Sequence, residues 1–253
     1  VYCGTYHQDH IDINKAICLL GEDMNTTVIN STSYGIWIFI DGVEVSNFTI
    51  ENSSMGIGVG SSNNIIHNCK FRFNKHQGCL VSYGSNNKFI NNWIYGWDKG
   101  FVLTSYNSKN NILIGNKLMN CSIYMDTGDK DEWNTHFIDN TNTIDGKPVY
   151  YYKNQTGGIV PSDAGEIILA NCSKISVINE SYPIRIYLGY SSNCLIYNNN
   201  IDLNSNIESG VVAVYSNNNI FYNNHIFGSM FNDLVDGMRF LKCDENKIIH
   251  NQV

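Results

Sequence analysis

A short phrase that begins with asparagine returns along this chain at nearly fixed intervals, and it limits the folds that the chain can adopt. Copies occupy residues 63–71, 86–94, 110–118, 193–201 and 218–226, and a last copy begins at Asn246. The end residues of the first three copies lie 23 and 24 residues apart, and those of the next two lie 25 apart. A period of this size indicates a solenoid, because one repeat cannot bury its apolar face without stacking on its neighbours.

The pattern inside each copy favours strands. Apolar and polar residues alternate over four to six positions and then stop at Asn, Gly or Ser, which is a period of two rather than 3.6. A leucine-rich repeat would need leucine at most inward positions, and a propeller blade would need about 40 residues. We therefore predict an all-β, right-handed parallel β-helix of about ten coils, each of about 22–28 residues.

One interval breaks the rhythm. Leu118 and Ile201 are 83 residues apart, which is about three coils plus additional length. We expect the excess within 125–165, as a loop or hairpin inserted in the solenoid. Because this insertion accounts for the additional length, residues 1–253 are predicted to form a single domain.

Stacking places equivalent residues of successive coils above one another. We expect two buried columns, formed by Phe71, Ile94 and Leu118 and by Ile66, Phe89 and Leu113. The position three residues before each end residue should form an asparagine ladder, since Asn tolerates left-handed turns and its amide can bond to the amides above and below. Its members are Asn68, Asn91, Asn198, Asn223 and Asn251, with Gly115 in the same column. A row of sugar ligands is the alternative interpretation of this column.

Composition excludes some classes of protein. The chain has 43% hydrophobic residues, only 15% charged residues, 38 asparagines and a net charge of −7. Nucleic-acid binding needs clustered Lys and Arg, so it is not expected. No apolar run approaches the roughly 18 residues needed to span a bilayer, and the first residues do not form a signal peptide.

The eight cysteines allow two interpretations. They show no CxxC pairs, which argues against a zinc ribbon. Disulfides would imply an extracellular setting, and the preferred pair is Cys172 with Cys194, one coil apart at 22 residues. Further candidate pairs are Cys3 with Cys18 and Cys69 with Cys79. The alternative is that several cysteines are reduced fillers of the core.

Sequons for N-glycosylation support secretion weakly, because a chain this rich in Asn, Ser and Thr contains many by chance. They occur at Asn25, Asn30, Asn47, Asn52, Asn120, Asn154, Asn171 and Asn179.

Several segments resemble a known family. Residues 4–23 and 25–29 are similar to the first coils of NosD-like proteins, also described as CASH-domain (carbohydrate-binding and sugar hydrolase) β-helices. Residues 142–152 and 167–173 resemble segments of archaeal members. The resemblance covers essentially the whole chain, and it implies a parallel β-helix at the cell surface or outside the cell.

The chain offers little evidence of catalysis. Glycoside hydrolysis needs two carboxylates across a cleft, and lyase chemistry needs calcium-binding acids with a basic group. The acid cluster is Asp126, Asp129, Asp131 and Glu132, which is a weak candidate calcium loop or simply solvated surface. We predict no catalytic residue and no cofactor, with Ca²⁺ as the alternative.

Two non-catalytic roles remain. Tyrosines 150, 151, 152, 187, 190, 197, 215 and 222 would form a strip for stacking sugar rings, or would pack across coils. The first strand has no helical cap and the last repeat stops at Val253, so the ends are expected to pair with other copies or to be capped by trimmed residues. We therefore expect an extracellular or cell-surface structural element whose partners are its own copies, other surface proteins or a glycan. A carbohydrate-binding module or a polysaccharide lyase or hydrolase is the alternative.

Overall fold

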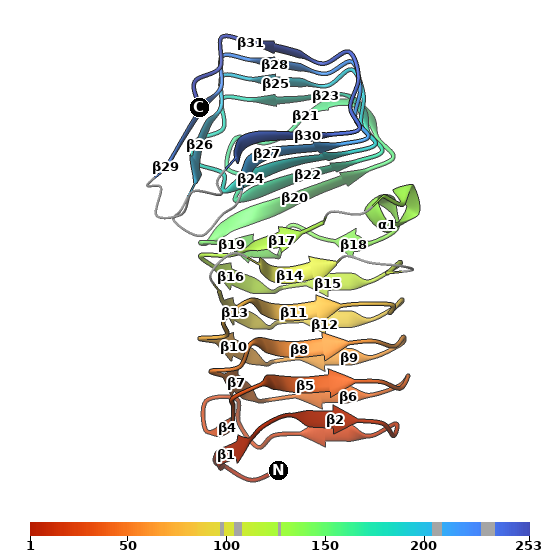
Figure 1. The fold of residues 1–253 in the computed structure, drawn as a ribbon, viewed down its shortest axis with the longest axis vertical. Coiled ribbons are helices and arrows are strands. Elements are labelled where there is room, and N and C mark those ends of the chain that lie inside the picture. Colours follow the sequence, from red (N-terminus) through yellow and green to blue (C-terminus); the bar gives the residue numbers. More distant parts are fainter. Residues whose placement is uncertain (97–98, 104–107, 126–127, 204–208, 229–235) are drawn as a thin grey trace. The chain divides into compact units, whose positions relative to one another are not determined.

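The computed structural model describes residues 1–96, 99–103, 108–125, 128–203, 209–228 and 236–253. The chain divides into two compact units. Unit 1 comprises Val1–Thr127 and Thr135–Asn142, and unit 2 comprises Gly128–Asn134 and Thr143–Val253. The single domain expected for residues 1–253 therefore stays a prediction. The fold class is confirmed, because the chain is all-β with one five-residue helix and its parallel strands trace about ten solenoid turns (Figure 1).

Unit 1 is a solenoid with three sheets of parallel strands. The first sheet contains β1 (Gly4–Gln8), β4 (Thr27–Ser31), β7 (Thr49–Glu51), β10 (Lys70–Arg72), β13 (Trp93–Tyr95) and β16 (Lys117–Met119). The second contains β2 (Ile11–Ile13), β5 (Tyr34–Ile38), β8 (Met55–Val59), β11 (Gln77–Val81), β14 (Lys99–Leu103) and β17 (Ser122–Tyr124). The third contains β3 (Cys18–Leu20), β6 (Glu44–Ser46), β9 (Ile65–His67), β12 (Lys88–Ile90), β15 (Ile112–Ile114) and β18 (Phe137–Ile138).

The two predicted core columns of unit 1 are confirmed. Phe71 pairs with Ile94 and Ile94 with Leu118 in the first sheet, and Phe89 pairs with both Ile66 and Leu113 in the third. None of these six side chains exposes more than 1% of its surface. Parallel strands about 4.8 Å apart stack equivalent apolar residues directly, so the repeat period alone determines which side chains meet.

The paired asparagines of the repeat occupy two different positions at the corners of the coil. The first of each pair has a left-handed backbone, with φ of 60° at Asn63 and 59° at Asn86. Asparagine adopts this conformation at low cost. The second residue points inward and is fully buried, as Asn64 and Asn87 are. We call this second position the corner slot.

Asparagines in the corner slots form the principal ladders of the molecule. In unit 1 they are Asn64, Asn87 and Asn111 in one row and Asn92, Asn116 and Asn142 in another. In each row the side-chain oxygen accepts the backbone N–H of the slot residue one coil earlier, and the amide nitrogen donates to a backbone carbonyl of that coil. Each amide therefore satisfies polar groups of a buried corner.

The predicted ladder lies one residue earlier, in the outer left-handed row. In this row the Asn223 amide nitrogen donates to Asn198 Oδ1 at 2.9 Å. Asn68 and Asn91 are left-handed as well, and the side-chain nitrogen of Asn68 contacts His67. The placement of Asn251 was wrong by one residue. Because Tyr222 pairs with Ile249, Asn251 belongs to the slot row, where it accepts from Asn224.

Unit 2 has a principal sheet with mostly longer strands and begins with the only helix of the described residues, α1 (Lys130–Asn134). The principal sheet contains β19 (Thr143–Ile144), β20 (Lys147–Lys153), β22 (Glu166–Ala170), β24 (Arg185–Gly189), β27 (Ser209–Val214) and β30 (Asp236–Leu241). A second sheet contains β21 (Thr156–Ile159), β23 (Ser173–Ile178), β25 (Leu195–Tyr197), β28 (Ile220–Tyr222) and β31 (Lys247–Ile249). A third contains β26 (Asn200–Leu203) and β29 (His225–Gly228).

The segment 125–165 contains the elements that break the repeat. Strands β19 and β20 form an antiparallel hairpin, and β20 then pairs in parallel with β22. Trp133 of α1 is fully buried and packs edge-on against Tyr187, with ring centroids 6.0 Å apart. The following coils are less regular than predicted: Tyr151, Ile168, Tyr187 and Val212 are register partners 17, 19 and 25 residues apart.

Candidate functional site

The outer face of the second sheet of unit 1 carries two rows of side chains along the coils. One row runs through Tyr34, Met55, Gln77, Lys99 and Ser122. The other runs through Asp12, Trp37, Gly58, Leu80, Val102 and Tyr124. The intervening residues Ile36, Ile57 and Cys79 point into the core and are fully buried. Gly35 also faces the interior, because a Cβ atom built on it would lie 2.3 Å from the Ile50 side chain. Regular strand alternation is therefore broken at Gly35, and this break brings Tyr34 and Trp37 to the same outer face.

Trp37 occupies the centre of this face because two glycines leave room for it. A Cβ atom built on Gly58 would overlap the benzo ring of Trp37, and one built on Gly60 would lie 3.2 Å from its Nε1. The indole thus extends from β5 across the neighbouring strand β8. Ordinary side chains at both glycine positions would force the ring away from the sheet.

Further rings surround Trp37. Tyr34 lies 5.8 Å from it and Phe39 lies 5.9 Å from it, between ring centroids. The His10 ring is 4.9 Å from that of Tyr34. Phe39 exposes 53% of its surface, and Tyr34 and Trp37 are half-buried, so the group faces solvent. We call Tyr34, Trp37 and Phe39, with His10 at their edge, the aromatic platform.

Asp12 supplies the charge beside the aromatic platform. Its carboxylate accepts a hydrogen bond from the Tyr34 hydroxyl at 3.3 Å and lies 3.8 Å from His10 Nε2. Partial desolvation, together with the Asp12 charge and hydrogen bond, raises the pKa of Tyr34 above its ordinary value. The Tyr34 hydroxyl thus joins the rim of the platform to a carboxylate.

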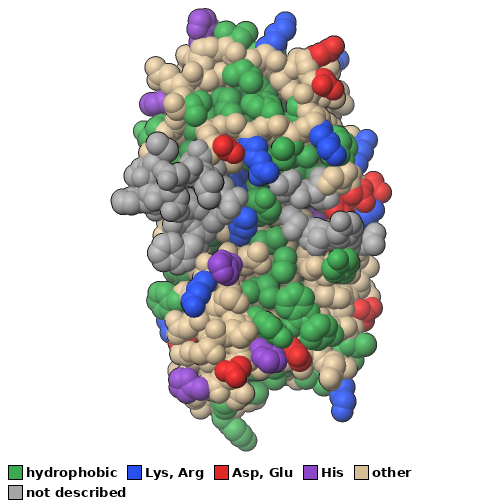
Figure 2. All heavy atoms as spheres, in the orientation of Figure 1, with side chains coloured by type: hydrophobic (Ala, Val, Ile, Leu, Met, Phe, Trp, Pro, Cys, Tyr) green, Lys and Arg blue, Asp and Glu red, His purple; other side chains and the backbone are tan. Residues whose placement is uncertain are grey.

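Figure 2 shows apolar side chains gathered on the face of unit 1 that bears this sheet, with histidine and acidic side chains at their border. An exposed aromatic surface with polar groups at its rim is suited to a ligand that has both flat apolar faces and hydroxyl groups. Sugar rings have this character.

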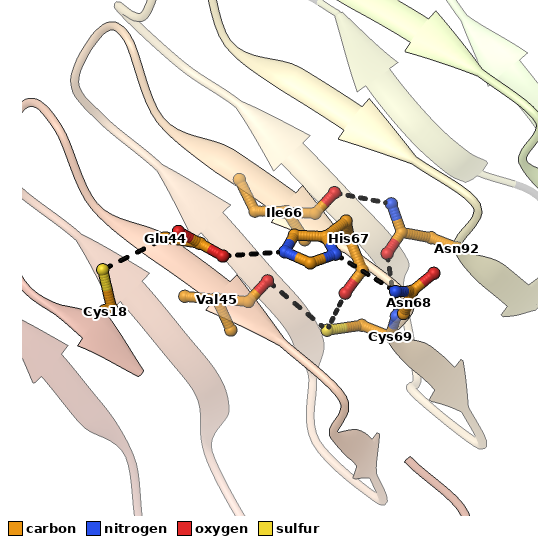
Figure 3. A network of polar contacts seen from close by, with 8 residues as sticks. All are labelled: Cys18, Glu44, Val45, Ile66, His67, Asn68, Cys69 and Asn92. Carbon is orange, nitrogen blue, oxygen red and sulfur yellow. Dashed lines mark hydrogen bonds and ion pairs between the residues drawn. The ribbon is translucent and has the colours of Figure 1, made fainter. Parts of the chain in front are cut away.

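A second polar group lies on the outer face of the third sheet of unit 1. Figure 3 shows Cys18, Glu44 and His67 in three successive coils. His67 Nε2 lies 2.9 Å from Glu44 Oε1, and the Cys18 thiol donates to Glu44 Oε2 at 3.7 Å. The hydrogen bond from His67 lowers the pKa of Glu44. Glu44 separates the thiol from the imidazole, so His67 does not serve as the base of a Cys–His nucleophile.

The acids of the predicted calcium loop diverge. Asp126 lies outside the described residues. Asp129 accepts the Asp131 backbone N–H at 2.9 Å, which caps α1, while Asp131 points to solvent and Glu132 is buried. Within the described part of the chain, no three His, Cys, Asp or Glu side chains gather as a metal would require. Calcium binding therefore stays a prediction.

Unit 2 contains a pocket of about 180 Å³ with charged groups on its walls. Asp145, Lys147, Tyr182 and Asp202 line it together with three smaller or apolar residues. Lys147 Nζ donates to the carbonyl of Ser181 at 2.7 Å. The coils thus place two carboxylates, Asp145 and Asp202, on the walls of one pocket although they are far apart in the sequence.

Comparison with known proteins identifies the architecture. A family model described as a right handed beta helix region matches residues 15–143. The chain belongs to this right-handed β-helix family. No curated protein matches it.

Two solved structures are similar to this chain at a low level. The A-module of the mannuronan C-5 epimerase AlgE4 from Azotobacter vinelandii is 15% identical, with a TM-score of 0.42, and the match covers 100% of this chain and 87% of the module. The A-module of AlgE6 from the same organism is 14% identical, with a TM-score of 0.36, and the match covers 100% and 86%. Neither likeness carries an argument about activity.

The predicted disulfides of this β-helix are corrected, because all eight cysteines are free thiols. Cys172 lies beside Ser191 and Cys194 beside Asn219, because the intervening coil is shorter than the repeat predicted. Cys69 is a buried slot residue and donates to backbone carbonyls, whereas Cys3 and Cys18 are exposed. The remaining candidate, Cys79, is also buried. Several cysteines thus fill the core, which was the alternative interpretation.

Most of the predicted tyrosine strip serves packing across coils. Tyr190 stacks on Tyr215 at 4.8 Å and Tyr197 on Tyr222 at 5.5 Å between ring centroids. Tyr187 is fully buried. The strongest aromatic surface lies instead at Trp37 in unit 1. The available signal was the pair Gly58 and Gly60 around Val59, because glycine in or beside a strand often marks a close approach of another group.

The sequons largely coincide with the corners of the β-helix. Asn47, Asn52, Asn120, Asn154, Asn171 and Asn179 all have a left-handed backbone. Asn154 accepts hydrogen bonds from the amides of Asn134 and Asn171. Asn25 and Asn30 lie outside this pattern, with Asn25 exposed and its side-chain oxygen bonded to Lys70. The repeat explains most of these motifs without a glycan, and glycosylation itself stays a prediction.

Among the described residues, no helix is long and apolar enough to cross a membrane.

Proposed function

We propose that this chain is an extracellular or cell-surface β-helix that binds carbohydrate on the aromatic platform of unit 1. The observation that carries the proposal is the position of Trp37, whose indole lies over Gly58 on an outer sheet face and is flanked by Tyr34 and Phe39. Large exposed aromatic groups of this kind mark interaction sites, because leaving them in water without a ligand costs free energy.

The polar rim supports a sugar over a purely apolar ligand. Asp12 and His10 place a carboxylate and an imidazole next to the rings, where they can bond to sugar hydroxyls. Gln77 and Lys99 continue the outer row in later coils. A chain of sugars running across the strands would meet an aromatic surface first and hydrogen-bonding groups further along.

A binding experiment with a matched control tests the proposal. The full chain is screened on an array of neutral and acidic polysaccharides, and the best ligand is titrated by calorimetry. We expect Trp37→Ala to weaken binding by about 30-fold or more, as loss of a central aromatic contact does elsewhere. Trp93→Ala is the control. Trp93 is also half-buried and on an outer sheet face, but Lys70 and Lys117 lie over its ring at 5.6 and 4.8 Å.

Two results would overturn the proposal. One is the absence of binding across the whole array by correctly folded protein. The other is an equal loss of affinity in Trp37→Ala and Trp93→Ala, which would place the ligand elsewhere.

The similarity to NosD-like and CASH-domain proteins supports a surface location and a sugar-related role for this chain. A structural role in a surface layer, fibre or sheath, with its own copies or surface proteins as partners, remains a prediction from the sequence. Light scattering on the natural full-length protein distinguishes the structural role from glycan binding. If the role is structural, the protein should form assemblies without any added glycan.

A polysaccharide-active enzyme is the second candidate, and the pocket of unit 2 favours it. Asp145 and Asp202 supply two carboxylates, and Lys147 supplies a basic group on the same walls. Acid and base roles divided between such groups are the basis of sugar-bond cleavage. The test is release of reducing ends or unsaturated products from the polysaccharides that bind. Activity lost in both Asp145→Asn and Asp202→Asn would establish the enzyme.

A further inference from the structure

Glu180 occupies a corner slot of unit 2 where the following coils have asparagine. It follows left-handed Asn179 and is 1% exposed. Its backbone N–H donates to Asn199 Oδ1 at 2.9 Å, and the same row continues through Asn224 and Asn251. Glu180 is therefore the first member of a buried ladder whose other members are neutral amides.

The amides of this ladder obey one rule. Asn199 accepts the backbone N–H of Glu180, and its amide nitrogen donates to the carbonyl of Val177, three residues before Glu180. Asn224 accepts the N–H of Asn199 and donates to the carbonyl of Ile196, three residues before Asn199. Each slot side chain thus needs one acceptor atom and one donor atom.

Glu180 supplies the acceptor but, when ionised, has no donor. Its Oε2 accepts the N–H of Ala164 at 3.4 Å, as an asparagine oxygen would. Its Oε1 is buried and has no hydrogen-bond partner among the described residues. In this row the amide donates to the carbonyl three residues before the residue whose N–H it accepts. Glu180 accepts the N–H of Ala164, so a donor at Oε1 would by the same rule bond to the carbonyl of Pro161.

We propose that Glu180 acts as a neutral carboxylic acid that replaces the ladder amide, so that the segment Val160–Gly165 is fastened to the next coil only while the proton is bound. The proton on Oε1 takes the role of an amide hydrogen. When it leaves, the corner loses its donor and a buried negative charge remains.

The surroundings of Glu180 favour the neutral form. Burial is the main reason that the pKa of Glu180 rises to about 7, and the nearby Asp163 carboxylate raises it further. The Ala164 N–H and the Lys147 ammonium group act in the opposite direction and lower the pKa. Tyr150 and Tyr152 also face this region, and the Tyr150 hydroxyl donates to Asp163 at 2.8 Å. An ionised Glu180 would repel Asp163, which belongs to the segment that Glu180 fastens.

The sign of the pH effect follows from linkage. The pKa of Glu180 in the folded state lies above its ordinary value of 4.5, so the folded protein binds more protons than the unfolded chain between pH 4.5 and about 7. The stabilisation is complete below this range and is lost as the pH rises through it. The folded-to-unfolded ratio should fall by up to about tenfold per pH unit there because of this group.

Carboxyl titration and amide exchange by NMR on the full chain test the proposal. In the unmodified protein we expect the Glu180 carboxyl to titrate near pH 7, and the Ala164 amide to lose protection at the same midpoint. Glu180→Gln, which supplies a permanent donor, should keep Ala164 protected throughout. Glu245→Gln, an exposed change in the same unit, should behave as the unmodified protein does. Asp163→Asn should lower the midpoint without abolishing the transition.

Three results would overturn the proposal. The first is a Glu180 carboxyl that titrates near its ordinary value. The second is an Ala164 protection that does not change with pH in the unmodified protein. The third is a Glu180→Gln protein whose Ala164 amide remains as sensitive to pH as before.

Discussion

Asn116 Oδ1 lies 3.0 Å from both the backbone nitrogen and the side-chain nitrogen of Asn92, so one atom joins two successive coils. The amide nitrogen of Asn116 completes the link by donating to the carbonyl of Phe89 and to Asn142 Oδ1. All three asparagines are fully buried. Their hydrogen bonds therefore replace water at a place that water does not reach.

Replacing Asn116 with alanine should destabilise the protein strongly. The change leaves the buried N–H of Asn92 and the carbonyl of Phe89 without their partner, and each orphaned group costs about 1–3 kcal/mol. We expect a loss of about 2–5 kcal/mol in the free energy of unfolding by urea. Asn25→Ala, at an exposed position, is the control. Equal stability of the two variants would show that the ladder contributes nothing.

Truncating Phe89 should be costly through packing alone. Its ring is fully buried in the column with Ile66 and Leu113 and packs edge-on against Phe101, with centroids 5.2 Å apart. Phe89→Ala should cost about 3–5 kcal/mol because a cavity remains. The neighbouring Lys88→Ala, on the outer face, should stay within about 0.5 kcal/mol of the unmodified protein. A small effect of Phe89→Ala in calorimetric unfolding would contradict the observed register.

The thiols should fall into two kinetic classes. Exposed Cys3 and Cys18 should react quickly with an aromatic disulfide reagent, whereas Cys69 and Cys79 should react only after unfolding. Burial raises the pKa of Cys69 to about 12 and that of Cys79 well above its ordinary value, so neither forms a thiolate at neutral pH. Cys18→Ser should remove one fast thiol. An intact mass two units lower per cysteine pair would instead reveal disulfides.

The contact of His67 with Glu44 should be visible in the titration of Glu44. His67 lowers the pKa of this carboxyl, so the contact stabilises the fold above the ordinary value of 4.5 and is lost as the pH falls. His67→Ala should move the Glu44 midpoint upward in carboxyl NMR. His7→Ala, at an exposed position, should leave it unchanged. An unchanged midpoint in both variants would mean that the contact is absent in solution.

The repeat period predicted the fold because it depends only on local spacing. Phe71, Ile94 and Leu118 meet for the same reason that they recur, since each is the middle residue of the corresponding strand in successive coils. The ladder was placed one residue too early because sequence alone does not separate a left-handed asparagine from the buried one that follows it. Asn63 and Asn64 differ only in this respect.

The candidate sites were less predictable, because they depend on contacts between coils. Trp37 and Gly58 belong to different repeats, and the indole lies over the glycine only because the two residues are register partners in adjacent strands. The Cys172–Cys194 prediction failed since it assumed a full coil where the chain uses a shorter one. Asp145 and Asp202 likewise line the same pocket although the first lies in a hairpin turn and the second in a later strand.

The contact between Trp37 and Gly58 also restricts how this surface can change over evolution. Any side chain at position 58 would occupy the space of the indole, so the glycine is needed while the tryptophan is present. Relatives that use this face should therefore keep both residues, and relatives that lose the tryptophan are free to gain a larger residue at 58. Covariation of these two positions would trace which members of the family retain the surface.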